Sequence, residues 1–147
     1  MAVSARPRHL QWRAWLIVAA GGAVGAAARE ALSLSIPPVG GVPVTIALIN
    51  ICGAFLLGYL YEALTRRPAG DSTGRNLRLL LGTGFCGGFT TYSSLATDAA
   101  VLAHHGHHWL AVLYTVGTVL LGAAATWAGI VTASRANERA SRAGAGL

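Results

Sequence analysis

The sequence predicts an all-α membrane protein in which four transmembrane helices cross the lipid bilayer. Apolar residues make up 54% of its 147 positions and charged residues only 11%, whereas about a quarter of an ordinary soluble domain is charged. No Asp, Glu, Lys or Arg occurs in residues 31–61, 79–97 or 102–134. Because a helix of about 20 apolar residues crosses the hydrocarbon core, these stretches are long enough to be membrane spans.

Turn-forming and polar residues separate the predicted spans. Pro37-Pro38 and Gly40-Gly41 follow the first span and end it, since proline and glycine both break helices. We expect a basic N-terminal segment at residues 1–13, a transmembrane domain at 14–134 and a polar C-terminal tail at 135–147. Within that domain the four spans are predicted at residues 14–34, 43–64, 77–103 and 109–134.

The arginines indicate how the helices are oriented. All eleven basic residues are Arg, and four crossings place ten of them on one side of the membrane: Arg6, Arg8, Arg13, Arg66, Arg67, Arg75, Arg78, Arg135, Arg139 and Arg142. Arg29, near the end of the first span, is the exception. Because cytoplasmic loops carry the excess of basic residues, both termini are predicted to be cytoplasmic. The arginines flank apolar spans and form no single basic surface, so no nucleic-acid binding is expected.

The third span has a composition unsuited to a regular helix. Residues 82–94 contain four glycines and six hydroxyl-bearing residues in thirteen positions, and each glycine costs a helix about 1 kcal/mol relative to Ala. We expect a break in the Gly-Gly-x-Thr-Thr segment, with Gly87-Gly88 as the favoured point. Broken backbone at membrane depth is tolerated only in a protein interior or beside a polar cavity. Freed carbonyls can hold a cation and freed N–H groups favour an anion, so this segment is the main candidate site.

Further polar residues lie deep in the second and fourth spans. Asn50 is a lone amide in an uncharged stretch. It is either a hydrogen-bond link between helices or a ligand for a transported species. Tyr114, Thr118 and Gly122 recur at four-residue spacing and share one helix face. Such a stripe is usually packing, but beside Asn50 and a broken helix it predicts a polar track.

The chain lacks the residues of a hydrolytic enzyme. No Ser-His-Asp set or carboxylate pair lies at membrane depth, because Glu62 and Asp98 are near span ends. No enzymatic activity is therefore expected. The His104–His108 segment contains four histidines, but without other ligands nearby a solvated turn is favoured over a metal site.

Four motifs recur in the predicted spans, one in each. They are Gly21-Gly22-x-x-Gly25-Ala26-x-x-Arg29, Asn50-x-x-Gly53-x-Phe55-Leu56-Leu57-Gly58, Gly84-Phe85-Cys86-Gly87-Gly88-Phe89-Thr90-Thr91-Tyr92-Ser93 and Tyr114-x-x-x-Thr118-x-x-x-Gly122. These motifs resemble the signatures of the CrcB/Fluc fluoride channel family, and the third is the most specific. The likeness extends from about Gly21 to Gly129.

The resemblance implies an antiparallel dimer in the cell membrane with two fluoride pores, through which fluoride leaves the cytoplasm passively. It also implies a structural sodium ion, Na+, that is not transported and lies at the dimer centre. The backbone carbonyls of Gly87 and Thr90 would hold this ion, and such oxygens are suitable hard ligands.

The resemblance also assigns residues to the pores. Asn50, Tyr114 and Thr118 would lie along them, with Tyr92 at the first of two positions where the family has a pore-facing Phe. Arg29 would lie in a vestibule, where its positive charge raises the local anion concentration.

Three positions depart from the family pattern. Leu95 replaces the second Phe and removes one ring edge, Ile46 stands where a Thr is usual (with Thr45 displaced by one), and Asp98 stands where Glu is frequent. An antiparallel homodimer needs insertion in both orientations, which the one-sided arginines disfavour. The alternative is therefore a one-way-inserted subunit of a heterodimeric fluoride channel, completed by a homologous second subunit.

Two further functions compete with a fluoride channel. A small four-helix drug or cation exporter needs an acidic residue deep in its first span, whereas Glu30 adjoins Arg29 near the span end. An accessory or assembly protein would not need a broken helix. Both are therefore less favoured.

Overall fold

The computed structural model describes residues 9–39, 41–65, 67 and 71–144, and nearly all of them are helical. The helices are α1 (His9–Ser35), α2 (Val44–Thr65), α3 (Ser72–Leu77), η1 (Arg78–Cys86), α4 (Gly87–Phe89), α5 (Tyr92–His104) and α6 (His108–Gly144). Over these ranges the β-structure is one isolated bridge, Val39–Val42, so the prediction of an all-α protein is confirmed.

Three of the helices are long and apolar enough to cross a membrane, at Trp12–Ser35, Val44–Thr65 and His108–Arg139. Their outer surfaces are apolar as well. Trp15 is 74% exposed, Leu34 81% and Trp109 77%. Large apolar side chains exposed along whole helices require a nonaqueous environment, which identifies a membrane protein.

The third predicted span is divided among shorter helices. α3, η1 and α4 follow one another from Ser72 to Phe89, and η1 is wound as a π-helix. Thr90 and Thr91 are then extended, with φ/ψ of −78°/153° and −149°/119°, before α5 begins. The interruption therefore lies at Thr90-Thr91 and not at Gly87-Gly88, where it was favoured, because Gly87 is helical (φ −65°, ψ −35°).

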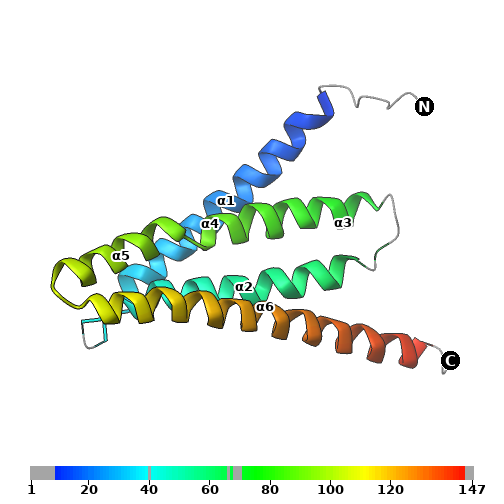
Figure 1. Ribbon diagram of the computed structural model, residues 1–147. Helices are drawn as coiled ribbons and strands as arrows, with labels where there is room; N and C mark the ends of the chain where they lie inside the picture. The colour runs from blue at the N-terminus through cyan, green and yellow to red at the C-terminus, as the bar shows by residue number, and fades with distance from the viewer. Residues whose placement is uncertain (1–8, 40, 66, 68–70, 145–147) are drawn as a thin grey trace, which may run out of the picture.

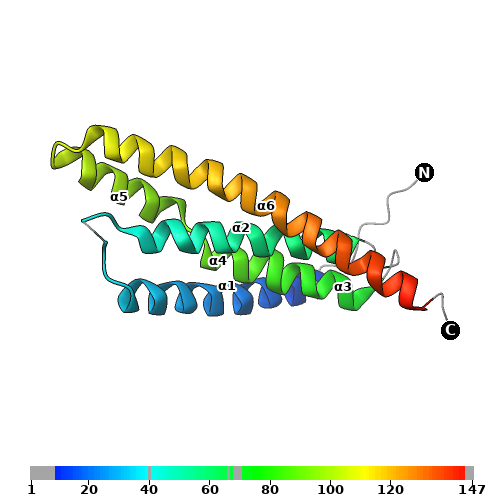
Figure 2. The same cartoon turned by 90° about the horizontal axis from the view of Figure 1, so that it is seen from below.

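The ends of the helices alternate between the two ends of the bundle (Figures 1 and 2). The start of α1, the end of α2, the start of α3 and the C-terminal end of α6 lie at one end. The end of α1, the start of α2 and the α5–α6 turn lie at the other. Seven of the ten arginines are described, and they belong to the first group of helix ends; Arg6, Arg8 and Arg66 lie outside the described residues.

The connections at the other end use the expected turn residues. Gly41, in the segment after Pro37-Pro38, has φ +82°, a conformation that favours glycine. Gly106 has φ +85° and closes α5. Its N–H donates to the Ala103 carbonyl at 3.0 Å, and the His107 N–H donates to the Leu102 carbonyl at 2.9 Å. This pair of bonds is a Schellman cap.

At the opposite end, Asp71 caps α3. Its carboxylate accepts from the Thr73 N–H at 2.9 Å and from Arg67 at 3.2 Å. Desolvation acts to raise the pKa of Asp71, but these hydrogen bonds and one from the Gly74 N–H outweigh it, so the pKa is lowered. The carboxylate therefore remains charged and able to cap the helix in mildly acidic solution.

Glycines form two seams along which helix backbones touch. The first seam joins α1 to the interrupted segment, which is the run from Ser72 to His104 that contains the break at Thr90-Thr91. There a Cβ at Gly25 would lie 2.2 Å from the Phe85 carbonyl, and a Cβ at Gly88 would lie 2.2 Å from the Gly22 carbonyl. In the second, between α2 and α6, a Cβ at Gly58 would lie 2.2 Å from the Thr126 carbonyl. Close contact of this kind drives association where lipid removes the hydrophobic drive between helices.

The helix α6 is longer than the predicted fourth span. It continues from Arg135 to Gly144 through the segment predicted as a polar tail, and its last turns project beyond α2 in both views (Figures 1 and 2). Its 37 residues extend about 55 Å, nearly twice the thickness of the hydrocarbon core.

The α2–α6 seam leads to a prediction about Gly129. A Cβ there would lie 2.2 Å from the Phe55 carbonyl and 2.8 Å from the Tyr59 nitrogen, so Gly129→Ala must push α2 and α6 apart, at a cost of about 1–3 kcal/mol. Thermal unfolding in detergent should show a lower Tm. Gly117→Ala on the same helix is the matched control, because nothing lies within 4 Å of its Cβ position. Equal melting of the two variants would contradict the seam.

Candidate functional site

A groove of about 760 Å³ lies between α2, the interrupted segment and α6. The residues from α2 form one helix stripe because they recur at three- and four-residue spacing: Asn50, Gly53, Ala54, Leu57, Leu60, Tyr61 and Leu64. The 15 residues from Asn50 to Leu64 give the groove a length of about 21 Å, more than half of the hydrocarbon thickness.

The other two walls bring hydroxyl groups and bare backbone to the groove. The interrupted segment contributes Arg78, Gly82, Thr83, Cys86, Gly87, Thr90, Thr91, Tyr92 and Leu95. The helix α6 contributes Thr118, Val119, Gly122 and Thr126. Apolar side chains therefore alternate with isolated polar groups along the groove.

Asn50 holds the interruption open. Its Nδ2 donates to the Thr91 carbonyl at 3.0 Å, and its Oδ1 accepts from the Thr91 N–H at 2.8 Å. The Asn50 amide thus provides hydrogen-bond partners for both the backbone N–H and the backbone carbonyl of Thr91. This contact agrees with the interpretation of Asn50 as a link between helices, and Asn50 also lines the groove.

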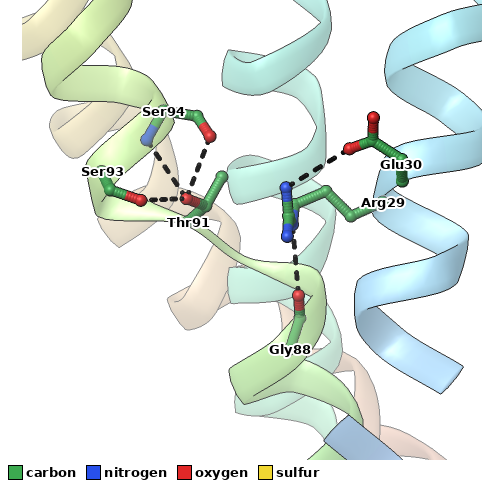
Figure 3. A network of polar contacts seen from close by, with 6 residues as sticks. All are labelled: Arg29, Glu30, Gly88, Thr91, Ser93 and Ser94. Atoms are coloured by element: carbon green, nitrogen blue, oxygen red, sulfur yellow. Dashed lines mark hydrogen bonds and ion pairs between the residues drawn. The ribbon is translucent and has the colours of Figure 1, made fainter. Parts of the chain in front are cut away.

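The two helix ends at the interruption are capped by side chains (Figure 3). The Thr91 hydroxyl accepts from the Ser94 N–H at 3.2 Å, which makes Thr91 the N-cap of α5. On the other side, Arg29 reaches over from α1 and its Nε donates to the Gly88 carbonyl at 3.3 Å. A cation beside the last carbonyls of a helix is favourable.

These contacts remove two carbonyls from the helical hydrogen-bond pattern. In a continuous helix the Thr91 N–H would donate to the Gly87 carbonyl and the Ser94 N–H to the Thr90 carbonyl. Here those N–H groups donate to Asn50 and to the Thr91 hydroxyl. Gly87 is also open to its surroundings, with nothing within 4 Å of its Cβ position.

The structure brings some of the predicted pathway residues together and separates others. Asn50, Tyr92 and Thr118 line the groove, as do Gly87 and Thr90. Tyr92 is 80% exposed, so its ring projects outward from the bundle.

Tyr114 and Arg29 lie outside the groove lining. Tyr114 is buried, and its hydroxyl lies 3.0 Å from the Pro43 carbonyl and 3.1 Å from the Asp98 carboxylate. The side chain of Arg29 is 25% exposed and lies 3.8 Å from Glu30. Tyr114 therefore ties α6 to α5 and to the start of α2, one turn from the groove.

Two of the three residues that depart from the family pattern are buried, whereas Asp98 is partly exposed. Leu95 and Ile46 are 4% and 8% exposed and belong to one apolar cluster. The neighbouring Thr45 is buried and donates to the Ile36 carbonyl at 3.1 Å. The displaced threonine thus fixes the start of α2 against the end of α1.

Thr91 and Arg78 are among the groove residues that the sequence did not assign to a site. Thr91 was considered only as part of the Gly-Gly-x-Thr-Thr segment, although Thr91-x-x-Ser94 after a break has the form of a helix N-cap. Arg78 was considered only as a topology signal, and its position in the groove depends on tertiary packing. The histidines of His104–His108 are exposed, and the described residues contain no cluster of three or more metal-binding side chains.

These features define an all-helical membrane protein with a polar groove beside an interrupted helix. The chain belongs to the CrcB family, since the family described as CrcB-like protein, Camphor Resistance (CrcB) matches residues 16–130. The resemblance found in the sequence motifs is therefore confirmed.

Several relatives carry names that state an activity. The chain is 44% identical over 127 residues to "Fluoride-specific ion channel FluC 2" of Leifsonia xyli, which covers 86% of this chain and 88% of the relative. It is 41% identical over 124 residues to "Fluoride-specific ion channel FluC" of Gloeobacter violaceus, which covers 80% and 94%. It is 43% identical over 117 residues to "Fluoride-specific ion channel FluC 1" of Mycobacterium bovis, which covers 79% and 86%.

The bond between Asn50 and Thr91 predicts a large effect of Asn50→Ala. The substitution leaves a partly buried N–H and a partly buried carbonyl without their partner, at a cost of about 1–3 kcal/mol for each unsatisfied group. Thermal unfolding in detergent should show a clear fall in Tm. Cys52→Ala is the control, because Cys52 is exposed on the same helix. If both variants melt at the wild-type temperature, the amide does not hold the interruption.

Proposed function

We propose that this protein is a fluoride-specific ion channel that lets fluoride leave the cytoplasm passively and so lowers intracellular fluoride. The observation that carries the proposal is the polar groove beside the Thr90-Thr91 interruption, in a chain whose relatives are named fluoride-specific ion channels. Fluoride is small and strongly hydrated, so a conducting path must replace its water with polar groups. Passive flow suits this purpose, because the neutral acid enters the cell, ionises there, and leaves as the anion.

The proposed setting is the cell membrane, with four crossings and both termini cytoplasmic. The run from Ser72 to His104 would be the third crossing, because its two halves lie alongside the other helices in both views (Figures 1 and 2). The described arginines outside Arg29 belong to segments at one end of the bundle, and the positive-inside rule assigns that end to the cytoplasm.

A second copy in antiparallel orientation is proposed to cover the groove. Its open side carries the exposed ring of Tyr92 and the bare backbone of Gly87, which are suited to contact with another protein surface. The two grooves of such a dimer would then form two closed pores with Asn50, Tyr92 and Thr118 in their walls. Tyr114 would act from behind the wall, and Arg29 would support the interruption.

A structural sodium ion is proposed at the dimer centre. The carbonyls of Gly87 and Thr90 have left the helical hydrogen-bond pattern because their usual donors bond to Asn50 and to Thr91. Uncharged backbone oxygens are the ligands that suit such a hard cation. Two copies would supply two pairs of carbonyls, and the ion would stabilise the dimer without being transported.

The channel predicts rapid fluoride efflux from liposomes that contain the purified protein. A fluoride-selective electrode should record fluoride efflux once a cation ionophore dissipates the membrane potential that opposes it. Chloride efflux should stay at the level of protein-free liposomes. Slow efflux that requires a drug and a proton gradient would instead support a small exporter. If neither fluoride nor drug moves, the channel proposal is wrong for this chain alone.

The alternative is a one-way-inserted subunit of a heterodimeric fluoride channel. It is favoured by the one-sided arginines and by Leu95 in place of a pore-facing ring. In this case fluoride efflux appears only after a homologous subunit of opposite orientation is added. C-terminal reporters divided evenly between the two membrane faces would contradict the fixed orientation.

The sodium site predicts a cation-specific effect on stability. An ion that binds only the folded dimer raises Tm in proportion to the logarithm of its concentration above Kd. We expect Tm in detergent to rise with the logarithm of the NaCl concentration, and not with equal concentrations of potassium or N-methylglucamine chloride. Identical melting in the three salts at equal ionic strength would refute the site.

A further inference from the structure

Arg78 has a position that the family motifs do not describe. Of the twenty side chains and glycines that line the groove, Arg78 is the only charged one. It stands at the start of η1 and contacts Leu64 near the end of α2, at the end of the bundle that carries most of the arginines. Among the described residues, the groove lining thus carries one fixed positive charge, at one mouth.

Three threonines farther along the groove use their hydroxyl protons within the protein. The hydroxyls of Thr90, Thr118 and Thr126 donate to the carbonyls of Cys86, Tyr114 and Gly122 at 2.8, 2.6 and 3.0 Å. In this arrangement the three hydroxyls present oxygen lone pairs to the groove, and an anion is repelled by lone pairs.

Arg78 is different because it has donors to spare. A guanidinium carries five N–H donors, and its hydrogen bond in this structure is one from Nη2 to the Leu64 carbonyl. Within the described part of the chain its partner is a carbonyl and not a carboxylate. Arg67, by contrast, pairs with Asp71 at 3.2 Å, and Arg29 lies 3.8 Å from Glu30.

We infer that Arg78 forms an anion-binding site at the cytoplasmic mouth of the groove, where fluoride loses its first water molecules before it enters. This inference rests on the proposed function and deepens it. The positive charge concentrates anions at the mouth, and the free N–H groups replace water with charge-assisted hydrogen bonds. The role that the resemblance gave to Arg29 thus passes to Arg78, because Arg29 lies outside the groove lining and beside a carboxylate.

A purely structural role for Arg78 makes a different prediction. Its bond to Leu64 caps the C-terminal end of α2, which an arginine can do with one N–H. Removal of a cap lowers stability, but it leaves the dependence of fluoride flux on concentration and ionic strength unchanged. An anion site, by contrast, alters both.

The test compares Arg78→Gln with Arg75→Gln in the liposome assay. Arg75 is exposed on α3 and is absent from the groove lining, so both variants remove one charge from the same surface but only one removes it from the groove. At low ionic strength Arg78→Gln should lower fluoride efflux roughly 3- to 10-fold at subsaturating fluoride. The loss should shrink as salt screens the charge, and Arg75→Gln should stay within about twofold of the wild type.

The outcomes separate this inference from the function on which it rests. If the wild type conducts fluoride and Arg78→Gln matches Arg75→Gln at every ionic strength, the site at Arg78 is wrong and the channel stands. If the wild type conducts no fluoride, either alone or with a homologous subunit of opposite orientation, both are wrong. Should Arg78→Gln fail to fold, Arg78→Lys, which keeps the charge, carries the test. It should retain at least half of the flux and its salt dependence, and loss of either would overturn the inference.

Discussion

The architecture depends on one contact, in which the side-chain amide of Asn50 bonds to both polar groups of Thr91. A peptide group in lipid must find a partner within the protein, since an unsatisfied one costs several kcal/mol. By occupying the Thr91 N–H, Asn50 ends the helix at Phe89 and allows a new one to start at Tyr92. Because the Asn50 side chain takes the place of a helical hydrogen bond, three other features follow. They are the freed Gly87 carbonyl, the N-cap at Thr91 and the contact between Arg29 and Gly88.

The glycine seams make that contact geometrically accessible. The helices α1 and α4 touch backbone to backbone at Gly22 and Gly88, and α2 meets α6 in the same way at Gly58. Gly53 has a related role, because a Cβ there would lie 2.3 Å from the methyl group of Thr90. The α2 helix can therefore approach the interruption closely enough for Asn50 to reach Thr91. Larger residues along these seams would move the amide away from its partner.

The groove combines a positive mouth with an interior of hydroxyl oxygens. A threonine that donates to its own helix can release that bond and turn its proton toward an anion, at a net cost of about 1 kcal/mol. Successive threonines would each make this exchange as an anion passes. In the proposed channel the initial electrostatic attraction would thus come from one arginine, and later contacts would come from side chains that reorient. This division would let a mostly apolar groove accommodate a strongly hydrated ion.

The amino-acid sequence alone was enough to predict an all-α membrane protein and to identify residues 82–94 as the candidate site. Uncharged stretches, a histidine-glycine turn and the glycine-rich composition of residues 82–94 are local signals, and local signals predict helices, turns and the existence of a break. The position of the break was predicted three residues too early, because glycine propensity is local whereas the partner of Thr91 lies on another helix. For the same reason, the sequence could not show that Thr118 faces the groove while Tyr114 does not. Tertiary packing also places Arg78 at the mouth of the groove and Arg29 beside the interruption. Two side chains on the same helix face have different surroundings when a neighbouring helix covers only one of them. Which one is covered depends on packing between segments that are far apart in the chain.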